Sequence, residues 1–219
     1  STSSKATIEH QFSDFSAYNV KLTVKGISGK PVTYEVPIRV WQNITSSYIK
    51  NAGDPFVRSD NRNQLVGNLA DWTATDNIKS LTSGVLYGGF LREYVLDGVT
   101  YNGVMDFYGK NALTNAKVYQ TTTLPAGSYR MVFNMLDFVG TNNCYFAIAK
   151  GSTMPDSSEM EGASIINKLH FDAMTDGSQE LFFTLDSEQT ITLGFVVNTT
   201  QAATGKYNEL LIKSVGLYK

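Results

Sequence analysis

The stretch that decides the fold is TTTLPAGSYRMVFNM, residues 121–135, which reads as two extended runs joined at Leu-Pro-Ala-Gly. Pro125 fixes φ at about −65° for the first central position of a turn, and Gly127 can adopt positive φ at little steric cost. After Gly127 the residues alternate, and one side of the run is apolar. That side consists of Tyr129, Met131, Phe133 and Met135. We therefore predict a corner between two strands, either a hairpin or a passage from one sheet to another.

Alternating or β-branched runs continue from this corner to the end of the chain. In residues 190–197 the inward stripe is Ile191, Leu193, Phe195 and Val197. The expected strands are 85–87, 92–96, 104–108, 118–123, 128–136, 144–149, 166–172, 180–185, 190–197 and 209–218. The polar segment GSTMPDSSEMEGAS connects the expected strands 144–149 and 166–172, and we expect one helical turn in it after Pro155. Strands at this spacing without long amphipathic helices predict an all-β protein, an antiparallel β-sandwich.

Residues 6–40 contain three alternating stretches, and GISGK between the last two has the spacing of a hairpin loop. The first stretch is Ile8, His10 and Phe12, the second begins at Tyr18, and the third begins at Val32. Three strands bury only one face among themselves, so this segment requires a partner surface. The alternating residue pattern ends before Asn43, where NITSSYIKNAGDPF predicts a helical turn with Thr45 as its N-cap. We place a domain boundary near Gln42, which gives domains 1–42 and 43–219.

Composition excludes several classes of partner. The net charge is −2 and the sequence has no Lys/Arg cluster, so we expect no nucleic-acid partner. No apolar run reaches the length of a membrane helix, so we expect no membrane span. The opening STSSKA is not a signal peptide, so any targeting segment has been removed or was never present. Cys144 is the single cysteine and lies in the apolar run CYFAIA, which predicts an inert buried thiol and no internal disulfide.

The sequence contains no catalytic or phosphate-binding motif, so we predict no catalytic residue, no cofactor and no metal ion. His170 and Asp172 share one strand face, but no nucleophile accompanies them. Paired carboxylates of a glycoside hydrolase remain an alternative, since the fold sets their separation. The loop acids that could form such a pair, and that also suit turns, are Asp71, Asp76, Asp97 and Asp106.

Residues 70–108 interleave aromatic and polar side chains, as a sugar-binding surface requires. Aromatic faces pack against the C–H side of a pyranose, and planar polar groups bond its hydroxyls. The candidate ligand-binding residues are Trp72, Tyr87, Arg92, Tyr101, Asn102 and Tyr108. The structural alternative is that the tyrosines pack on strands with their hydroxyls at the rim, and that Trp72 fills the core.

Residues 10–40 resemble the second half of a polycystic-kidney-disease (PKD) repeat, a small immunoglobulin-like sandwich. The matching positions are His10, Phe12, Tyr18, Val20, Leu22 and Val24. The family's Trp-x-Phe-Gly-Asp-Gly corner is absent, and Ala17 stands where a glycine is usual. The resemblance implies that residues 1–42 are a truncated module or a partial sheet docked on its neighbour.

Residues 43–219 resemble a C-terminal domain family of unknown function from surface lipoproteins of Bacteroidetes-type bacteria. That family is similar to the galactose-binding-like jelly roll of many carbohydrate-binding modules. The stretches that carry the resemblance are NITSSYIKNAGDPF, LADWTATDNI, VYQTTTLPAGSYRMVF, ITLGFVV and LLIKSVGLY. Many relatives have an aspartate in the last strand that contributes to a calcium site, whereas this chain has Lys213 and Ser214 there. A lysine repels a cation, so the calcium site is not carried over.

These features lead to an expected function of non-catalytic binding of a poly- or oligosaccharide at a bacterial cell surface, in support of glycan capture. The resemblance implies an extracytoplasmic location, at the cell surface or in the periplasm, as a processed lipoprotein with a lipid anchor upstream of this chain. The first alternative is a structural or adhesive module that binds other proteins of a surface complex. The second alternative is a glycoside hydrolase. The sequence names neither the glycan nor the oligomeric state.

Overall fold

The computed structural model describes residues 7, 9–27, 29–61, 63–78, 81–82, 85–86, 88–140, 142–171 and 177–219. Two compact units divide the chain: one contains residues 1–43 and Lys219, and the other contains residues 44–218. Within the described ranges, no helix is long and apolar enough to cross a membrane.

The first unit contains an antiparallel hairpin of β1 (Ala17–Lys25) and β2 (Pro31–Arg39). Strict alternation in both strands places their apolar side chains on one face of the ribbon. That face includes the cross-strand pairs Val20–Val36, Leu22–Tyr34 and Val24–Val32, and all six of these side chains are exposed. The expected strand around His10 and Phe12 is not formed, because the described residues 9–16 are irregular. Instead, the ring of Phe12 packs 4.4 Å from that of Tyr18, centroid to centroid.

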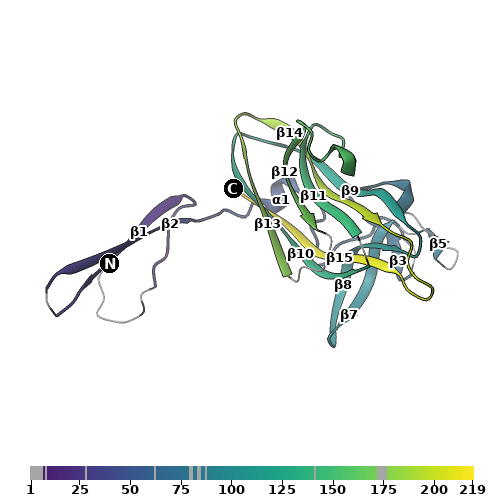
Figure 1. Cartoon of the computed structure of the whole chain (residues 1–219), viewed down its shortest axis with the longest axis horizontal. Helices are drawn as coiled ribbons and strands as arrows, with labels where there is room; N and C mark the ends of the chain where they lie inside the picture. Colours follow the sequence, from purple (N-terminus) through teal and green to yellow (C-terminus); the bar gives the residue numbers. More distant parts are fainter. Residues whose placement is uncertain are drawn as a thin grey trace. The chain divides into compact units, whose positions relative to one another are not determined.

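The second unit is an antiparallel sandwich of two sheets (Figure 1). The six-stranded sheet has the order β13-β10-β15-β8-β7-β3, and the five-stranded sheet has the order β12-β11-β14-β9-β4. The strands of the first sheet are β3 (Val66–Asn68), β7 (Gly89–Leu96), β8 (Val99–Gly109), β10 (Gly127–Val139), β13 (Gly177–Leu185) and β15 (Asn208–Tyr218). Those of the second are β4 (Thr73–Ala74), β9 (Leu113–Leu124), β11 (Asn142–Lys150), β12 (Ile165–Phe171) and β14 (Gln189–Thr199). A further two-stranded ribbon pairs β5 (Leu81–Thr82) with β6 (Val85–Leu86). This arrangement confirms the predicted all-β sandwich.

The predicted corner is a passage between the two sheets. β9 ends at Leu124 in one sheet, and β10 begins at Gly127 in the other. The φ of Gly127 is 154°, and the Tyr129 hydroxyl donates a hydrogen bond of 2.6 Å to the Pro125 carbonyl. The chain also changes sheets from β12 to β13 to β14 to β15, which is the connectivity that lets a jelly roll enclose one core.

The core lies between the sheets and contains the stripes that the sequence predicts. The β10 stripe and the β14 stripe are almost wholly buried. Their rings meet at the centre, where Phe133 lies 4.8 Å from Phe146 and 5.2 Å from Phe195, centroid to centroid. Such aromatic contacts add to the free energy of burial. The inward stripe of one strand is therefore packed against that of the opposite sheet.

The helical segments are single turns: α1 (Thr45–Tyr48), η1 (Asp76–Ile78) and η2 (Ser157–Glu159). The prediction of Thr45 as the N-cap is wrong, because Thr45 is the first helical residue and Ile44 occupies the cap position. The Thr45 hydroxyl instead bonds the backbone of Leu217. The expected turn after Pro155 is confirmed as η2. A capping box of Asp156 and Glu159 stabilises its N-terminus.

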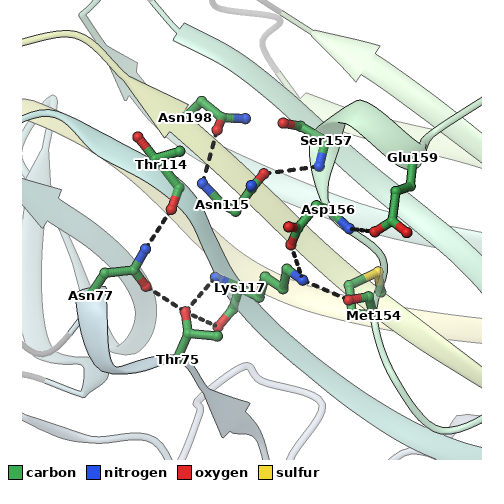
Figure 2. A network of polar contacts seen from close by, with 10 residues as sticks. All are labelled: Thr75, Asn77, Thr114, Asn115, Lys117, Met154, Asp156, Ser157, Glu159 and Asn198. Atoms are coloured by element: carbon green, nitrogen blue, oxygen red, sulfur yellow. Dashed lines mark hydrogen bonds and ion pairs between the residues drawn. The ribbon is translucent and has the colours of Figure 1, made fainter.

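A polar network fastens the connection between β11 and β12 to the outside of the five-stranded sheet (Figure 2). The Lys117 ammonium donates to the Met154 carbonyl at 2.7 Å and pairs with the Asp156 carboxylate at 2.5 Å. Asn115 accepts a hydrogen bond from the Ser157 amide at 2.9 Å. The Lys117 side chain is mostly buried beneath the connection, so this network is a structural clamp.

Candidate ligand-binding site

An irregular segment between α1 and β3 builds one wall of a surface cavity. In this segment Asn51, Gly53 and Asp54 all have positive φ, and the Asp54–Pro55 peptide bond is cis. The segment lies against β15, where the Asp54 amide donates to the Lys213 carbonyl at 3.2 Å. A Cβ atom on Gly53 would lie 2.5 Å from that same carbonyl oxygen, so only glycine fits.

Asn51 holds this wall in place. Its side-chain amide donates to the carbonyls of Val57 and Ala70, at 2.9 and 2.6 Å. Its side-chain oxygen accepts the Val57 amide at 2.7 Å, and its own carbonyl accepts the indole N–H of Trp72 at 2.8 Å. Asparagine tolerates the left-handed conformation that the chain adopts here, with φ of 46°.

The opposite wall is the first half of β8. The cavity has a volume of about 360 Å³, within the range of small-ligand sites. Its lining residues are Asp54, Pro55, Val99, Thr100, Tyr101, Asn102, Gly103, Val104 and Lys213. β8 bends at Gly103, whose φ is 63° and whose carbonyl accepts the Phe56 amide at 2.8 Å. A Cβ atom there would lie 2.2 Å from the Phe56 carbonyl oxygen.

The two charged side chains of the cavity, Lys213 and Asp54, form an ion pair. Lys213 Nζ lies 3.4 Å from Asp54 Oδ2 and 5.8 Å from the centroid of the Tyr101 ring. Tyr101 is half-buried, and Asn102 beside it is exposed. The ammonium and amide groups donate hydrogen bonds, the carboxylate accepts them, and the phenol ring offers an apolar face. This set suits a polyhydroxylated ligand that carries no net charge.

A second polar cluster lies on the same sheet, outside the cavity lining. The Tyr94 hydroxyl of β7 donates a hydrogen bond to the Asp137 carboxylate of β10. Glu209 of β15 is 7% exposed and lies directly opposite Tyr108 of β8. Burial, and then the charge of Asp137, raise the pKa of Glu209 to about 7. Burial, and then the bond to Asp137, raise the pKa of the Tyr94 phenol well above its ordinary value.

The structure brings two of the predicted binding residues, Tyr101 and Asn102, into the cavity. Arg92 is exposed on β7 and donates to Asn63 Oδ1 at 3.0 Å. Tyr108 is half-buried, with its ring centroid 5.4 Å from that of Tyr207. Tyr87 lies outside the described residues.

Trp72 lies in the core of the sandwich, in agreement with the structural alternative. It is 6% exposed, and its ring packs edge-on against Phe56 at a centroid distance of 6.3 Å. Its polar sequence neighbours suggest a surface position, but the loop folds so that its N–H reaches the Asn51 carbonyl. The ring therefore presents no open face to a ligand.

The candidate catalytic groups take separate places. His170 Nε2 lies 2.7 Å from Asn143 Oδ1, and Asp172 lies outside the described residues. Cys144 is buried, and that burial raises its thiol pKa to about 12, so the thiol is inert at neutral pH. Asp106 is buried in β8, within the strand expected at 104–108, so its grouping with the loop acids is wrong. Across the described ranges, no three His, Cys, Asp or Glu side chains are grouped so that they could hold a metal ion.

Sequence reasoning did not select Asp54 and Lys213 as ligand-binding residues. Asp54 stands between Gly53 and Pro55, which indicate the end of a helical turn, and Lys213 indicates only a departure from a calcium-binding pattern. The lysine and the aspartate are 159 positions apart in the sequence and meet through the bridge between Gly53 and Ser214. A second cavity, of about 610 Å³, lies at the turn between β13 and β14, where its polar lining includes Lys150, Asp186 and Glu188.

No curated protein matches the sequence of this chain. Among solved structures, the module TmCBM61 in complex with β-1,4-galactotriose is 13% identical with a TM-score of 0.46, over 78% of this chain and 97% of that one. A carbohydrate-binding module of the β-sandwich superfamily with promiscuous specificity is 12% identical with a TM-score of 0.41, over 100% of this chain and 80% of that one. The CBM51-2 and INT domains of Clostridium perfringens ZmpB, with GlcNAc, are 8% identical with a TM-score of 0.35, over 94% of this chain and 38% of that one.

These structural likenesses are too remote to bear on the ligand. The family comparison is more direct, because one family model matches residues 50–194, which is well over half of the chain and includes both walls of the cavity. The chain therefore belongs to the domain family of unknown function DUF5013.

Proposed function

We propose that the sandwich binds a carbohydrate, without catalysis, in the cavity between the 51–57 segment and β8. The observation that supports this proposal is the meeting of an aromatic ring, an amide and a charge-balanced Lys–Asp pair in one cavity of about 360 Å³. Tyr101 would pack against the C–H face of a sugar ring, while Lys213 and Asp54 would donate to and accept from its hydroxyls. An opposite-charge pair of this kind favours a neutral sugar over an acidic one.

The biological setting that we propose is glycan capture at a bacterial cell surface, by an extracytoplasmic and lipid-anchored protein. Two features of the composition agree with this setting. Charged residues make up only 17% of the sequence, and aromatic residues make up 12%. The sequence resemblance to surface lipoproteins is the other support.

Affinity electrophoresis against a broad panel of soluble poly- and oligosaccharides tests the proposal. We expect at least one neutral glycan to retard the intact chain. We expect Tyr101→Ala and Lys213→Met each to weaken that binding about tenfold, which corresponds to about 1.4 kcal/mol. Phe182→Ala is the matched control, because Phe182 is an exposed aromatic residue of β13 that does not line the cavity. If no glycan on the panel retards the chain, the proposal is wrong.

The same observations do not favour a glycoside hydrolase. Glu209 and Asp137 do approach one another, and the Glu209 pKa is raised. Neither carboxyl, however, lines either of the two cavities, and Glu209 is nearly inaccessible. A general acid must reach the glycosidic oxygen of a bound sugar, and this pair lacks such access.

A structural or adhesive module is the second candidate function, and the apolar face of the β1–β2 hairpin favours it. An isolated two-stranded ribbon is marginal in water, and a contiguous exposed apolar face marks an interaction surface. The occupant that we propose is a second copy of the chain, because two identical ribbons offer each other matching apolar faces of equal length. Sedimentation at increasing concentration tests this: we expect dimers of the wild type and monomers of Leu22→Lys. A monomer of the wild type at all concentrations would remove this candidate.

A further inference from the structure

The β7–β8 hairpin forms a wall of the cavity, and its Tyr94 side chain reaches across the sheet to β10. Residues 99–104 of β8 line the cavity. Tyr94 of β7 bonds Asp137 of β10, although β8 and β15 lie between β7 and β10 in the sheet. The tip of the hairpin is a two-residue turn, Asp97-Gly98, with positive φ at both positions, which is the turn that suits a twisted ribbon. The Tyr94–Asp137 bond thus fixes the hairpin from one side, and the cavity wall depends on its position.

The backbone allows the outer part of the hairpin, residues 94–101, to open beyond Gly103 by local loss of its β7–β8 pairing. The backbone pairing between β8 and β15 ends at Met105 opposite Ile212, so beyond that pair β8 contacts β15 through side chains, such as Tyr101 with Lys213. Gly103 then bends the strand and bonds the Phe56 amide through its carbonyl. A bend where the pairing of β8 with β15 ends is a natural hinge.

Glu209 lies close to the point where Tyr94 is fastened. The strand register places titratable groups from each neighbouring element on the same face as Glu209. Val139 and Tyr108 lie directly opposite Glu209, and Asp137 and Asp106 lie opposite Leu211, two residues further along β15. Tyr94 of β7 and Tyr207 ahead of β15 complete the set. These titratable groups are carboxyls and phenols, so none of them supplies a positive charge to balance an ionised Glu209. Ionisation therefore places a second negative charge beside Asp137 in a site with little access to water.

We propose that the Tyr94–Asp137 bond is a latch under proton control, which is closed while Glu209 is protonated and released when Glu209 ionises. Opening of the hairpin lets water reach the two carboxylates and relieves their repulsion. Because residues 99–101 line the cavity and lie in the part that opens, the cavity is complete at acidic pH and incomplete at alkaline pH. The consequence for ligand binding rests on the proposed function, whereas the opening itself does not.

Burial and the neighbouring carboxylate set the pH at which the latch responds. In the closed hairpin the pKa of Glu209 is about 7, against an ordinary value of 4.5 for a solvated glutamate. If opening restores the ordinary value, the equilibrium constant for opening rises about tenfold between pH 6 and pH 8.

Hydrogen exchange of the intact chain, without ligand, tests the latch. We expect the amides of residues 94–101 to exchange from an open state that is about tenfold more populated at pH 8 than at pH 6, after correction for the intrinsic pH dependence of exchange. Glu209→Gln is expected to abolish that difference and keep the hairpin closed. Glu93→Gln, which changes an exposed glutamate of the same hairpin, is expected to retain it. Tyr94→Phe removes the latch and is expected to raise exchange at both pH values.

Equal protection of residues 94–101 at the two pH values in the wild type would overturn the latch, as would an undiminished difference in Glu209→Gln. Glycan binding that is found at pH 6 and persists unchanged at pH 8 would show that the cavity wall does not follow the latch, and would also overturn the proposal. A panel without any bound glycan would remove the proposed function but leave the exchange result interpretable. The two failures are therefore distinguishable.

Discussion

Replacement of Asn51 by alanine should destabilise the sandwich strongly, because this one side chain ties the 51–57 segment to the backbone around it. The side chain makes three hydrogen bonds to the backbone of Val57 and Ala70, all between 2.6 and 2.9 Å. Each contributes about 1 kcal/mol to stability. Alanine at this position, where φ is 46°, costs about a further 1 kcal/mol because it tolerates the left-handed conformation poorly. We therefore expect Asn51→Ala to lower the free energy of unfolding by about 4 kcal/mol.

Urea denaturation, followed by tryptophan fluorescence, measures this loss, and an unchanged m-value shows that the transition remains comparable. Asn51→Gly is the matched variant, because glycine lacks the same hydrogen bonds but accepts the backbone conformation. We expect Asn51→Gly to lose about 3 kcal/mol, so the difference of about 1 kcal/mol isolates the backbone term. If both variants remain within about 0.5 kcal/mol of the wild type, the side-chain bonds do not hold the 51–57 segment and the reasoning fails.

Three further predictions concern the sheet surface, the clamp and the core. The folded chain holds a proton on Glu209 up to a pH of about 7, whereas the unfolded chain releases it near 4.5, so the free energy of unfolding should fall by about 3 kcal/mol as the pH rises through that window. Thermal melts between pH 4.5 and pH 8 should show this fall in the wild type and not in Glu209→Gln, with the exposed Glu188→Gln as control. Lys117→Met removes the ammonium that bonds Asp156 and the Met154 carbonyl, and it should increase proteolysis within residues 151–164 while leaving the rest of the sandwich protected. Trp72→Phe should cost about 2 kcal/mol, from the lost indole bond to Asn51 and the lost ring volume, and unfolding in urea measures it.

The parts of the fold that local chemistry determines were predictable from the sequence. The corner at residues 124–127 depends on a proline and a glycine within three residues of each other, and the stripes of β10 and β14 repeat with period two. The same reasoning failed where a partner far along the chain decides the outcome. The first alternating stretch has a strand pattern but no neighbouring strand among the described residues, and it is irregular. The alternation of residues 99–103 was hidden by the turn residues around it, so they read as a loop and are part of β8.

The candidate site was predictable only in part, for the same physical reason. The sequence predicts Tyr101 and Asn102 as binding residues because they are adjacent in an aromatic and polar interval. Lys213 joins them through the pairing of β15 with an irregular segment, and no local pattern encodes that pairing. Trp72 shows the opposite error: a tryptophan in a polar stretch suggests exposure, but a single backbone carbonyl satisfies its N–H and lets it enter the core.

The cavity is separable from the core, because its walls are positioned by irregular backbone. Asn51 and Gly53 shape one wall, and Gly103 shapes the other, each through a positive φ that regular strand backbone does not have. The side chains that would touch a ligand, Tyr101 and Lys213, project from these walls and are not part of the buried stripes between the sheets. A change at either position therefore alters what the cavity recognises at little cost in stability, whereas a change at a shaping position alters the cavity and the stability together. This division of roles lets one sandwich present different binding surfaces on the same core.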